Sequence, residues 1–358
     1  MRHKRFLPLH CAIIFTALTV SDRLSAEATL GRFPLCEASA ALLVTCPGGG
    51  DECLLVGDNE QGRELYLFPV KGQKLNSGAQ RPFDLHLHGG NEIKDIEALA
   101  GVSGGEILVF GSHSRNTICE GKKKRRQFGR GSLSTAQTVV VDTLLSKTVT
   151  CDNLFDSRVL DAPMKAACDA IDAADLNATQ ISDAVRANVL AEDDAEAPCN
   201  AVTAFNAEGA VAITSNGTTD VWIGLRAPLL PAHPSQPGKR NLAILLHMKD
   251  LAAYTFDRVA FVDLGGRGVR DLSSDATSIW VIAGPPEDRT EPFELRRFPK
   301  SALGAAQVID SELIGALPPS SEGLAISGKT AYVVIDGDTG DGVDCKEPAR
   351  YEVVSLPD

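Results

Sequence analysis

Short runs of β-branched and other apolar residues recur along the chain, and glycine, proline or aspartate bounds each run. Clear examples lie at 54–56, 107–110, 221–223, 279–282 and 332–335. Runs of this length between turn-forming residues are typical of short β-strands and not of helices. The pattern therefore predicts an all-β chain.

A related phrase precedes four of these runs and places an acid at the head of a strand. The four acids are Glu97, Glu208, Asp271 and Glu322. A turn and a second strand follow each acid, and the second strand ends at glycine or aspartate. Repeats of about 45–60 residues with three or four strands are typical of propeller blades. We therefore expect a β-propeller of five or six blades that occupies residues 29–358 as one domain.

One region, from about 119 to 199, departs from this pattern. It opens with the basic run 122–126 and then becomes rich in alanine. Ile181, Val185 and Val189 recur at a spacing of four, which predicts one face of a helix. We interpret 119–199 as a partly helical insertion between blades, and we expect it at one end of the central channel.

Two short motifs resemble catalytic loops, and their context argues against that interpretation. Residues 323–330 fit the phosphate-loop pattern G-x-x-x-x-G-K-[ST], which requires a following helix. Residues 101–105 fit the nucleophile-elbow pattern G-x-S-x-G, which has the same requirement. A strand pattern follows in both cases, so we predict two hairpin turns and no nucleotide cofactor.

The first 28 residues have the layout of a signal peptide. A basic start is followed by the apolar run 11–20 and by Ala26-Glu27-Ala28, which matches the A-x-A cleavage pattern. The apolar run is shorter than the roughly 20 residues that span a bilayer. We therefore expect an exported protein, periplasmic or extracellular, with no transmembrane segment in its mature form.

The cysteines support the same compartment. Nine cysteines minus Cys11 leave eight, an even number that predicts disulfides in an exported chain. The sequence leaves their connectivity open, with Cys46–Cys53 and Cys168–Cys199 as local pairs.

The charge of the chain limits its partners. The 35 Lys and Arg and 47 Asp and Glu become 31 and 45 when residues 1–28 are removed, because that segment holds four and two of them. The resulting net charge of about −14 disfavours nonspecific binding of nucleic acid and favours cations.

Two groups of acids are candidate calcium sites. If the blades are equivalent, Glu97, Glu208, Asp271 and Glu322 face one another around the channel, and a bound calcium ion would relieve their repulsion. Alternatively, each acid caps a turn or pairs with Arg267, Arg270 or Arg226. The second group follows a predicted strand and has an alternative as a solvated loop; its members are Asp336, Asp338, Asp341 and Asp344.

Basic side chains near strand ends are candidates for binding an anion. His113 and Arg115 follow a predicted strand directly, where blade loops form a binding face. Arg226 and Arg267 lie at comparable positions in later repeats. A turn without a ligand is the alternative interpretation for His113 and Arg115.

Several longer stretches are similar to an uncharacterised bacterial family, domain of unknown function 3616, which is thought to be β-propeller-like. The stretches are 56–60, 95–97, 111–116, the basic run with Phe128, 222–226, 263–268 and 282–285. The resemblance implies the fold and supplies no reaction. The phrase Glu322-Gly323-Leu324-Ala325 also resembles phytase-like esterase domains.

Two classes of function follow from these observations. The first is a module that binds an unknown small molecule or protein through an acidic channel, which is also a candidate calcium site. The alternative is a calcium-dependent hydrolase of phosphate esters or other esters, with metal at Glu97, Glu208 and Glu322. In that mechanism Arg115, Arg226 and Arg267 would neutralise developing charge, so acids and arginines should meet at one channel mouth. The catalytic residues are unknown at this stage.

Overall fold

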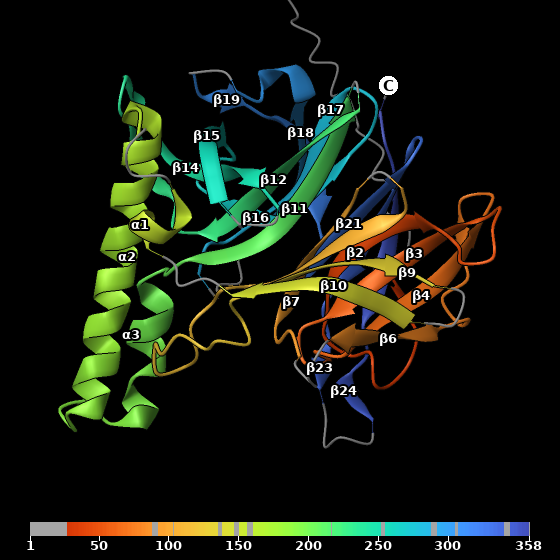
Figure 1. The fold of residues 1–358 in the computed structure, drawn as a ribbon, viewed down its shortest axis with the longest axis horizontal. Coiled ribbons are helices and arrows are strands. Elements are labelled where there is room, and N and C mark those ends of the chain that lie inside the picture. The colour runs from red at the N-terminus through yellow and green to blue at the C-terminus, as the bar shows by residue number, and fades with distance from the viewer. Residues whose placement is uncertain are drawn as a thin grey trace, which may run out of the picture.

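The computed structural model describes residues 27–87, 92–102, 104–134, 138–146, 150–155, 160–215, 217–251, 255–287, 292–304, 307–339 and 344–357. The predicted signal peptide, 1–28, lies outside these residues except for Glu27 and Ala28. Strands form most of the described chain, and the α-helices lie between 151 and 201 (Figure 1). The predicted all-β fold class is confirmed.

The strands form blades in chain order, and each blade begins with its inner strand. The first blade contains β2 (Ala38–Thr45), β3 (Glu52–Asp58), β4 (Glu64–Lys71) and β6 (Arg81–Leu87), with β5 (Lys74–Leu75) beside β4. The second contains β7 (Ile96–Gly101), β8 (Glu106–Gly111), β9 (Gln127–Leu133) and β10 (Thr138–Ser146). The third contains β11 (Asn206–Ser215), β12 (Thr218–Ala227), β14 (Gln236–Asp250) and β15 (Thr255–Asp263), with β13 (Leu230–His233) beside β14.

Two further blades complete the set. The fourth contains β16 (Gly268–Ser274), β17 (Ser278–Gly284), β18 (Phe293–Pro299) and β20 (Glu312–Leu317). The fifth contains β21 (Ser321–Ser327), β22 (Thr330–Ile335), β25 (Arg350–Ser355) and β1 (Ala28–Thr29). The short strands β23 (Asp338–Thr339) and β24 (Cys345–Glu347) pair with each other.

The five inner strands form a closed ring. Strands β2, β7, β11, β16 and β21 contact one another in this order, and β21 in turn contacts β2. The predicted propeller therefore has five blades.

The ring is closed by residues from both ends of the described chain. Strand β1 pairs with β25 through Ala28 and Tyr351 and through Thr29 and Arg350. A disulfide between Cys36, just before β2, and Cys345 joins the first blade to the segment that precedes β25. The fifth blade therefore depends on chain segments that are more than 300 residues apart.

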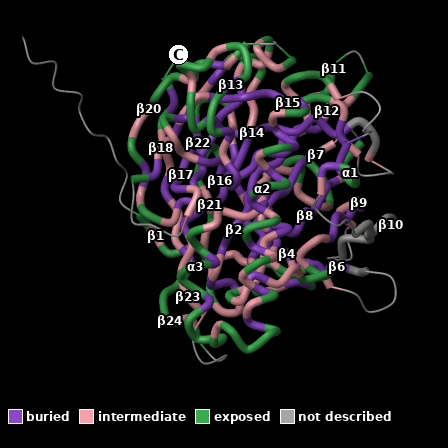
Figure 2. The backbone as a smooth tube through the Cα atoms, turned by 90° about the vertical axis from the view of Figure 1, so that its left-hand side faces the viewer, coloured by how far each residue is buried: buried purple, intermediate pink, exposed green. Residues whose placement is uncertain are grey.

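The apolar core is divided among the interfaces between blades. Each of the five interfaces holds its own cluster of buried side chains. Trp222 packs in the cluster between the third and fourth blades, and Trp280 in the one between the fourth and fifth. Figure 2 shows buried positions along the strands and exposed positions at many of the turns. Burial of apolar area at about 25 cal/mol per Å² therefore stabilises every blade through its two neighbours.

Two parallel strand pairs add hydrogen bonds between neighbouring blades. Strand β6 of the first blade pairs in parallel with β10 of the second. Strand β15 of the third blade pairs in parallel with β19 (Ile309–Asp310), which lies in the connection between β18 and β20 of the fourth. The outer edges of these blades are therefore joined as well as their inner strands.

The helical insertion follows the second blade. It contains α1 (Cys151–Leu154), α2 (Ala162–Arg186), η3 (Glu192–Asp194) and α3 (Glu196–Ala201). The predicted range 119–199 was too wide, because 127–133 and 138–146 form β9 and β10. The glycines and polar residues of β9 produce no apolar run, yet the strand forms because β8 and β10 pair with it.

Helix α2 has the expected amphipathic pattern in part. The carboxylate of Asp161 accepts a hydrogen bond from the Met164 amide and caps its first turn. Val185 is buried and Ile181 is half-buried, as the predicted face requires. Val189 lies beyond the end of the helix and is 81% exposed, so its inclusion in that face was wrong.

The two catalytic-loop motifs are hairpin turns, as predicted. Residues 328–329 connect β21 to β22, and residues 102–105 connect β7 to β8, with residue 103 outside the described residues. None of the described helices is long and apolar enough to cross a membrane.

All eight predicted cysteines form disulfides. The predicted pair Cys46–Cys53 is confirmed. The predicted pair Cys168–Cys199 was wrong, because Cys168 bonds to Cys151 and Cys199 bonds to Cys119. Cys151 and Cys168 meet because α2 folds back on α1, and Cys119 and Cys199 meet because α3 packs near the second blade. Neither arrangement can be inferred from the sequence separation of the cysteines.

Candidate functional site

Each inner strand carries a β-bulge at its second or third residue. The strand register shifts at this point in all five blades. The residues at the bulges are Ser39, Glu97, Glu208, Arg270 and Glu322. A bulge changes the direction of a side chain relative to the sheet, and all five residues line the same pocket. We call this set the bulge ring.

Small residues after the bulge let neighbouring inner strands approach closely. A Cβ atom added at Gly209 would lie 2.7 Å from Cγ1 of Val269 in the next inner strand. One at Gly323 would meet Ala40 and Ala41 at 3.0 Å. The repeated pattern of a polar residue followed by alanine or glycine therefore reflects both the ring and its close packing.

The pocket has a volume of about 570 Å³ and lies where acids and arginines converge. Its acids are Asp95, Glu97, Glu208, Glu287, Glu322 and Asp336. Its arginines are Arg115, Arg125, Arg226 and Arg270. Of the arginines named from the sequence, Arg115 and Arg226 line this pocket and Arg267 does not.

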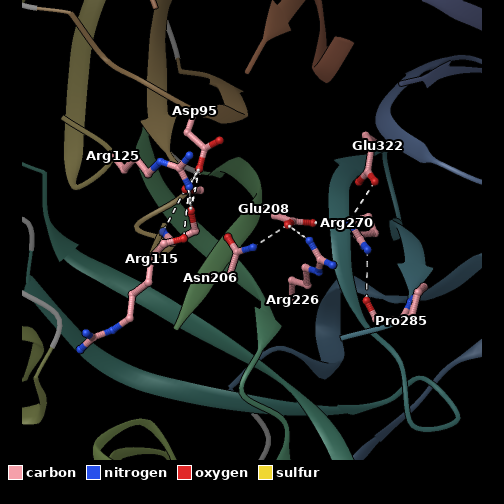
Figure 3. A network of polar contacts seen from close by, with 11 residues as sticks. Asp95, Arg115, Arg125, Asn206, Glu208, Arg226, Arg270, Pro285 and Glu322 are labelled. Atoms are coloured by element: carbon pink, nitrogen blue, oxygen red, sulfur yellow. Dashed lines mark hydrogen bonds and ion pairs between the residues drawn. The ribbon is translucent and has the colours of Figure 1, made fainter. Parts of the chain in front are cut away.

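Arg270 is the cation of the bulge ring. Its Nη1 donates to Glu208 Oε2 at 3.1 Å and to Glu322 Oε1 at 2.8 Å, and its Nη2 donates to the Pro285 carbonyl at 3.2 Å (Figure 3). The guanidinium also lies over the Phe293 ring, 5.2 Å from its centroid. Arg270 therefore occupies the place between two glutamates where the sequence predicted a metal ion.

Glu208 is surrounded by donors. Its Oε1 accepts from Asn206 Nδ2 at 2.7 Å and from Arg226 Nη1 at 3.0 Å, in addition to the bond from Arg270 to Oε2 (Figure 3). The side chain is only 3% exposed. Charge-assisted hydrogen bonds of this kind compensate its burial and fix its position.

Glu97 is in the opposite situation. No hydrogen-bond or ion-pair partner for its carboxyl group lies among the residues that the structure describes. Burial raises the pKa of Glu97 well above its usual value, and the nearby Glu208, Asp95, Glu322 and Asp336 raise it further. The surroundings of Glu97 therefore favour its protonated form over its carboxylate.

Ser39 creates a gap in the bulge ring. Its strand β2 lies between β7, which carries Glu97, and β21, which carries Glu322. The serine hydroxyl donates to the Ile96 carbonyl, so this short side chain stays at the ring wall. The other four members are long, so the ring has a short side chain, 1% exposed, between Glu97 and Glu322. We call this position of the ring the serine gap.

Acceptor oxygens without partners line the same pocket. They are Asn59 Oδ1, Asn206 Oδ1, Glu322 Oε2 and Asp336 Oδ1, each buried and without a partner among the described residues. A buried acceptor without a donor costs about 1–3 kcal/mol. A ligand that brings donors would recover this free energy.

Two further acids of the pocket have raised pKa values. Burial raises the pKa of Asp336 to about 9, with a contribution from Glu322. Burial raises the pKa of Glu322 to about 7, and the Arg270 guanidinium opposes this increase. Perturbed acids of this kind concentrate at functional sites.

The second blade and the insertion form another wall. Arg125 pairs with Asp95 at 3.2 Å and donates to Ser114 Oγ at 2.6 Å. Arg115 pairs with Asp175 of α2 and donates to Thr179 at 3.1 Å (the arginines are labelled in Figure 3). The disulfide Cys119–Cys199 links this loop to α3, and residues just after α3 line the pocket. The insertion therefore forms a side wall of the pocket.

Asp271, a predicted metal ligand, does not line the pocket. Its oxygens accept from the amides of Leu272 and Leu324, both at 2.7 Å, and from that of Ala41. It thus fastens three inner strands to one another. The prediction of Asp271 as a ring residue was wrong. The bulge places the preceding residue, Arg270, at the position that corresponds to the three glutamates.

Two of the predicted anion-binding residues have other contacts. His113 is buried, its Nδ1 lies 2.9 Å from the Gly111 carbonyl, and burial lowers its pKa to about 4. A neutral imidazole offers an anion no charge. Arg267 pairs with Glu294 at 3.0 Å and donates to the Pro292 carbonyl, away from the pocket lining.

The second acidic group does not gather. Asp336 lines the central pocket, whereas Asp338 pairs with Lys346 at 2.5 Å. Asp344 is exposed, and Asp341 lies outside the described residues. Throughout the described part of the chain, no three His, Cys, Asp or Glu side chains are placed to hold a metal ion.

The chain matches one protein family and is similar to several solved structures. Residues 69–315 match the family model described as "Protein of unknown function (DUF3616)". A search of curated proteins found no match. Among solved structures, the chain is similar to a mutant of B. megaterium levansucrase, with a TM-score of 0.44, 10% identity and coverage of 90% of this chain and 83% of that one.

Two other solved structures have comparable similarity. The structure of YjhT has a TM-score of 0.38 at 9% identity, with 87% of this chain and 76% of that chain covered. A protein of unknown function from Dyadobacter fermentans DSM 18053 has a TM-score of 0.40 at 9% identity, with 94% and 99% covered.

Proposed function

Since the chain belongs to the DUF3616 family, whose description assigns no reaction, we propose a function from the pocket itself: an exported module that binds a small, neutral, polyhydroxylated ligand such as a sugar. The observation that carries the proposal is the set of acceptor oxygens without partners around one pocket. Hydroxyl groups supply the missing donors, and they also accept a hydrogen bond from a protonated acid such as Glu97.

The charge balance disfavours an anionic ligand. Six acids and four arginines line the pocket. Arg115, Arg125 and Arg270 already pair with carboxylates, as does Arg226 with Glu208. A phosphate ester would therefore meet an excess of carboxyl groups and compete with them for every guanidinium. This argues against phosphate esters as substrates in the alternative hydrolase interpretation.

A calcium ion is the competing occupant. Arg270 already neutralises Glu208 and Glu322, so calcium would have to bind beside a fixed positive charge. The raised pKa values of Glu97 and Asp336 also mean that calcium would have to displace protons at neutral pH. The positive charge of Arg270 and the raised pKa values of the two acids therefore both favour a neutral ligand over calcium. The pocket volume lies within the range of about 300–1,000 Å³ that is usual for small-molecule sites.

The test is calorimetric titration of the oxidised protein at pH 7 with methyl glycosides of common hexoses and pentoses, calcium chloride and inorganic phosphate. We expect binding of at least one glycoside, weakened about tenfold or more by Glu322→Gln, since a charge-assisted hydrogen bond contributes about 1.5–3 kcal/mol. The matched control is Glu312→Gln, because Glu312 pairs with Arg297 on the surface. Binding of calcium or phosphate with no response to any glycoside would refute the proposal.

A further inference from the structure

The serine gap places two carboxyl groups with different surroundings in one pocket. Glu97 lines the pocket from the second blade and Glu322 from the fifth, and the inner strand that carries Ser39 lies between theirs. Arg270 holds Glu322 Oε1 at 2.8 Å and leaves Oε2 without a partner in the described chain. Burial and the charges of Glu208, Asp95, Glu322 and Asp336 raise the pKa of Glu97. One group is therefore oriented and charge-compensated, and the surroundings of the other favour its protonated form.

We propose that this pair hydrolyses a glycosidic bond of the ligand, with Glu97 as general acid and Glu322 as general base. The proposal rests on the polyhydroxylated ligand proposed above and assigns the reaction that its pocket performs. Two carboxyl groups in unequal environments, one protonated and one ionised, are the minimum that such a hydrolysis needs.

The reaction balances with water as the only co-reactant. Glu97 gives its proton to the glycosidic oxygen as the bond between that oxygen and the sugar carbon breaks, and the bonding electrons stay on the oxygen. Glu322 Oε2 takes a proton from a water molecule whose oxygen forms the new bond to carbon. Two hydroxyl products leave, and proton exchange with solvent returns Glu97 to its acid form and Glu322 to its carboxylate.

The surrounding charges set the expected pH profile. Glu97 faces Glu208, Asp95, Glu322 and Asp336; Glu322 faces Arg270, Arg226 and Glu208. Activity needs Glu322 ionised, so kcat/KM should rise with pH through about 7, in keeping with its pKa. It should fall at higher pH, where Glu97 loses its proton.

The test uses a panel of 4-nitrophenyl glycosides and the corresponding methyl glycosides, with binding and turnover measured on the same samples. Glu97→Gln should lower kcat/KM for a methyl glycoside by about 10²–10⁴ and much less for the nitrophenyl glycoside, since nitrophenolate leaves without a proton. Glu322→Gln should reduce turnover of both and remove the acidic limb of the profile. Glu312→Gln, a surface control, should change neither.

A further variant tests the gap without touching either acid. Ser39→Thr adds one methyl group and keeps the hydroxyl that donates to Ile96, so it should fold and weaken binding and turnover together. Glycosides that bind to the wild type without turnover would refute the reaction and leave the binding proposal intact. Failure of every glycoside to bind would refute both.

Discussion

Replacing Arg270 by methionine should destabilise the protein strongly and in a pH-dependent way. The guanidinium donates to Glu208 and Glu322, and both carboxylates are at least nine-tenths buried. Methionine has a similar length and can pack on Phe293, so the main loss is charge compensation. Removing one partner of a buried ion pair costs about 3–5 kcal/mol, and here two carboxylates lose the same partner.

The sign of the pH effect follows from the carboxyl groups that remain. Without Arg270, the pKa of Glu322 in the folded protein rises further above its unfolded value, so the folded state binds more protons than the unfolded state. The loss of about 3–5 kcal/mol should therefore appear at pH 8 and become smaller as the pH falls to 5.

The assay is urea unfolding of the oxidised protein, followed by the fluorescence of Trp222 and Trp280. Arg186→Gln is the control, since Arg186 is 60% exposed and such pairs contribute about 0–1 kcal/mol. Adding Glu208→Gln and Glu322→Gln to the Arg270 variant should restore much of the stability at pH 8. A loss below about 1 kcal/mol at pH 8, or an equal loss at pH 5, would contradict the role of Arg270 as the ring cation.

Three further predictions concern stability. Because the pKa of Glu322 is raised in the folded protein, it stabilises the wild type at pH values below its unfolded pKa of 4.5, and this contribution is lost as the pH rises through about 7. Glu322→Gln should therefore reduce the change of the urea midpoint with pH between about 4.5 and 7. An unchanged pH dependence of the midpoint would contradict this prediction. Asp271→Ala should cost about 2–5 kcal/mol, because it leaves two or three buried amides without an acceptor, and added calcium should not alter that loss; a calcium-dependent loss would restore the metal interpretation. Serine at both positions of the Cys36–Cys345 pair should cost about 3 kcal/mol more than at the Cys46–Cys53 pair, since the closed loops span 309 and 7 residues, and equal midpoints would refute the loop-entropy argument.

The fold could be predicted from the sequence because each blade repeats a local pattern. Alternating apolar runs, turn residues and the acid-small phrase all depend on neighbours along the chain. Strand β9 was missed because its formation depends on pairing with β8 and β10, and its own residues include glycines and half-buried polar residues.

The site could be predicted only in part, for a reason of register. Glu97, Glu208 and Glu322 were identified because each is an acid at the head of a strand, which is the feature by which the repeat was recognised. Arg270 was predicted only as an alternative partner of the acids and not as a member of the ring, because Val269-Arg270-Asp271-Leu272 was aligned on its acid, although the bulge falls at the arginine. Ser39 carries no charge and gave no signal. A three-residue pattern fits Ser39 and the three glutamates at its second position. Its first residue is small or apolar, its second is any residue and its third is alanine or glycine.

The way the ring closes determines when the pocket comes into being. Glu322 and Asp336 belong to the blade that is completed by β1 from one end of the described chain and by β25 from the other. During synthesis, a nascent polypeptide that has made only its first four blades already carries Ser39, Glu97, Glu208 and Arg270, yet half of the serine gap is missing. We therefore expect the proposed ligand to bind only after the fifth blade has formed. A chain that stalls or is cut before the last blade would not bind it, although most of its blades are folded.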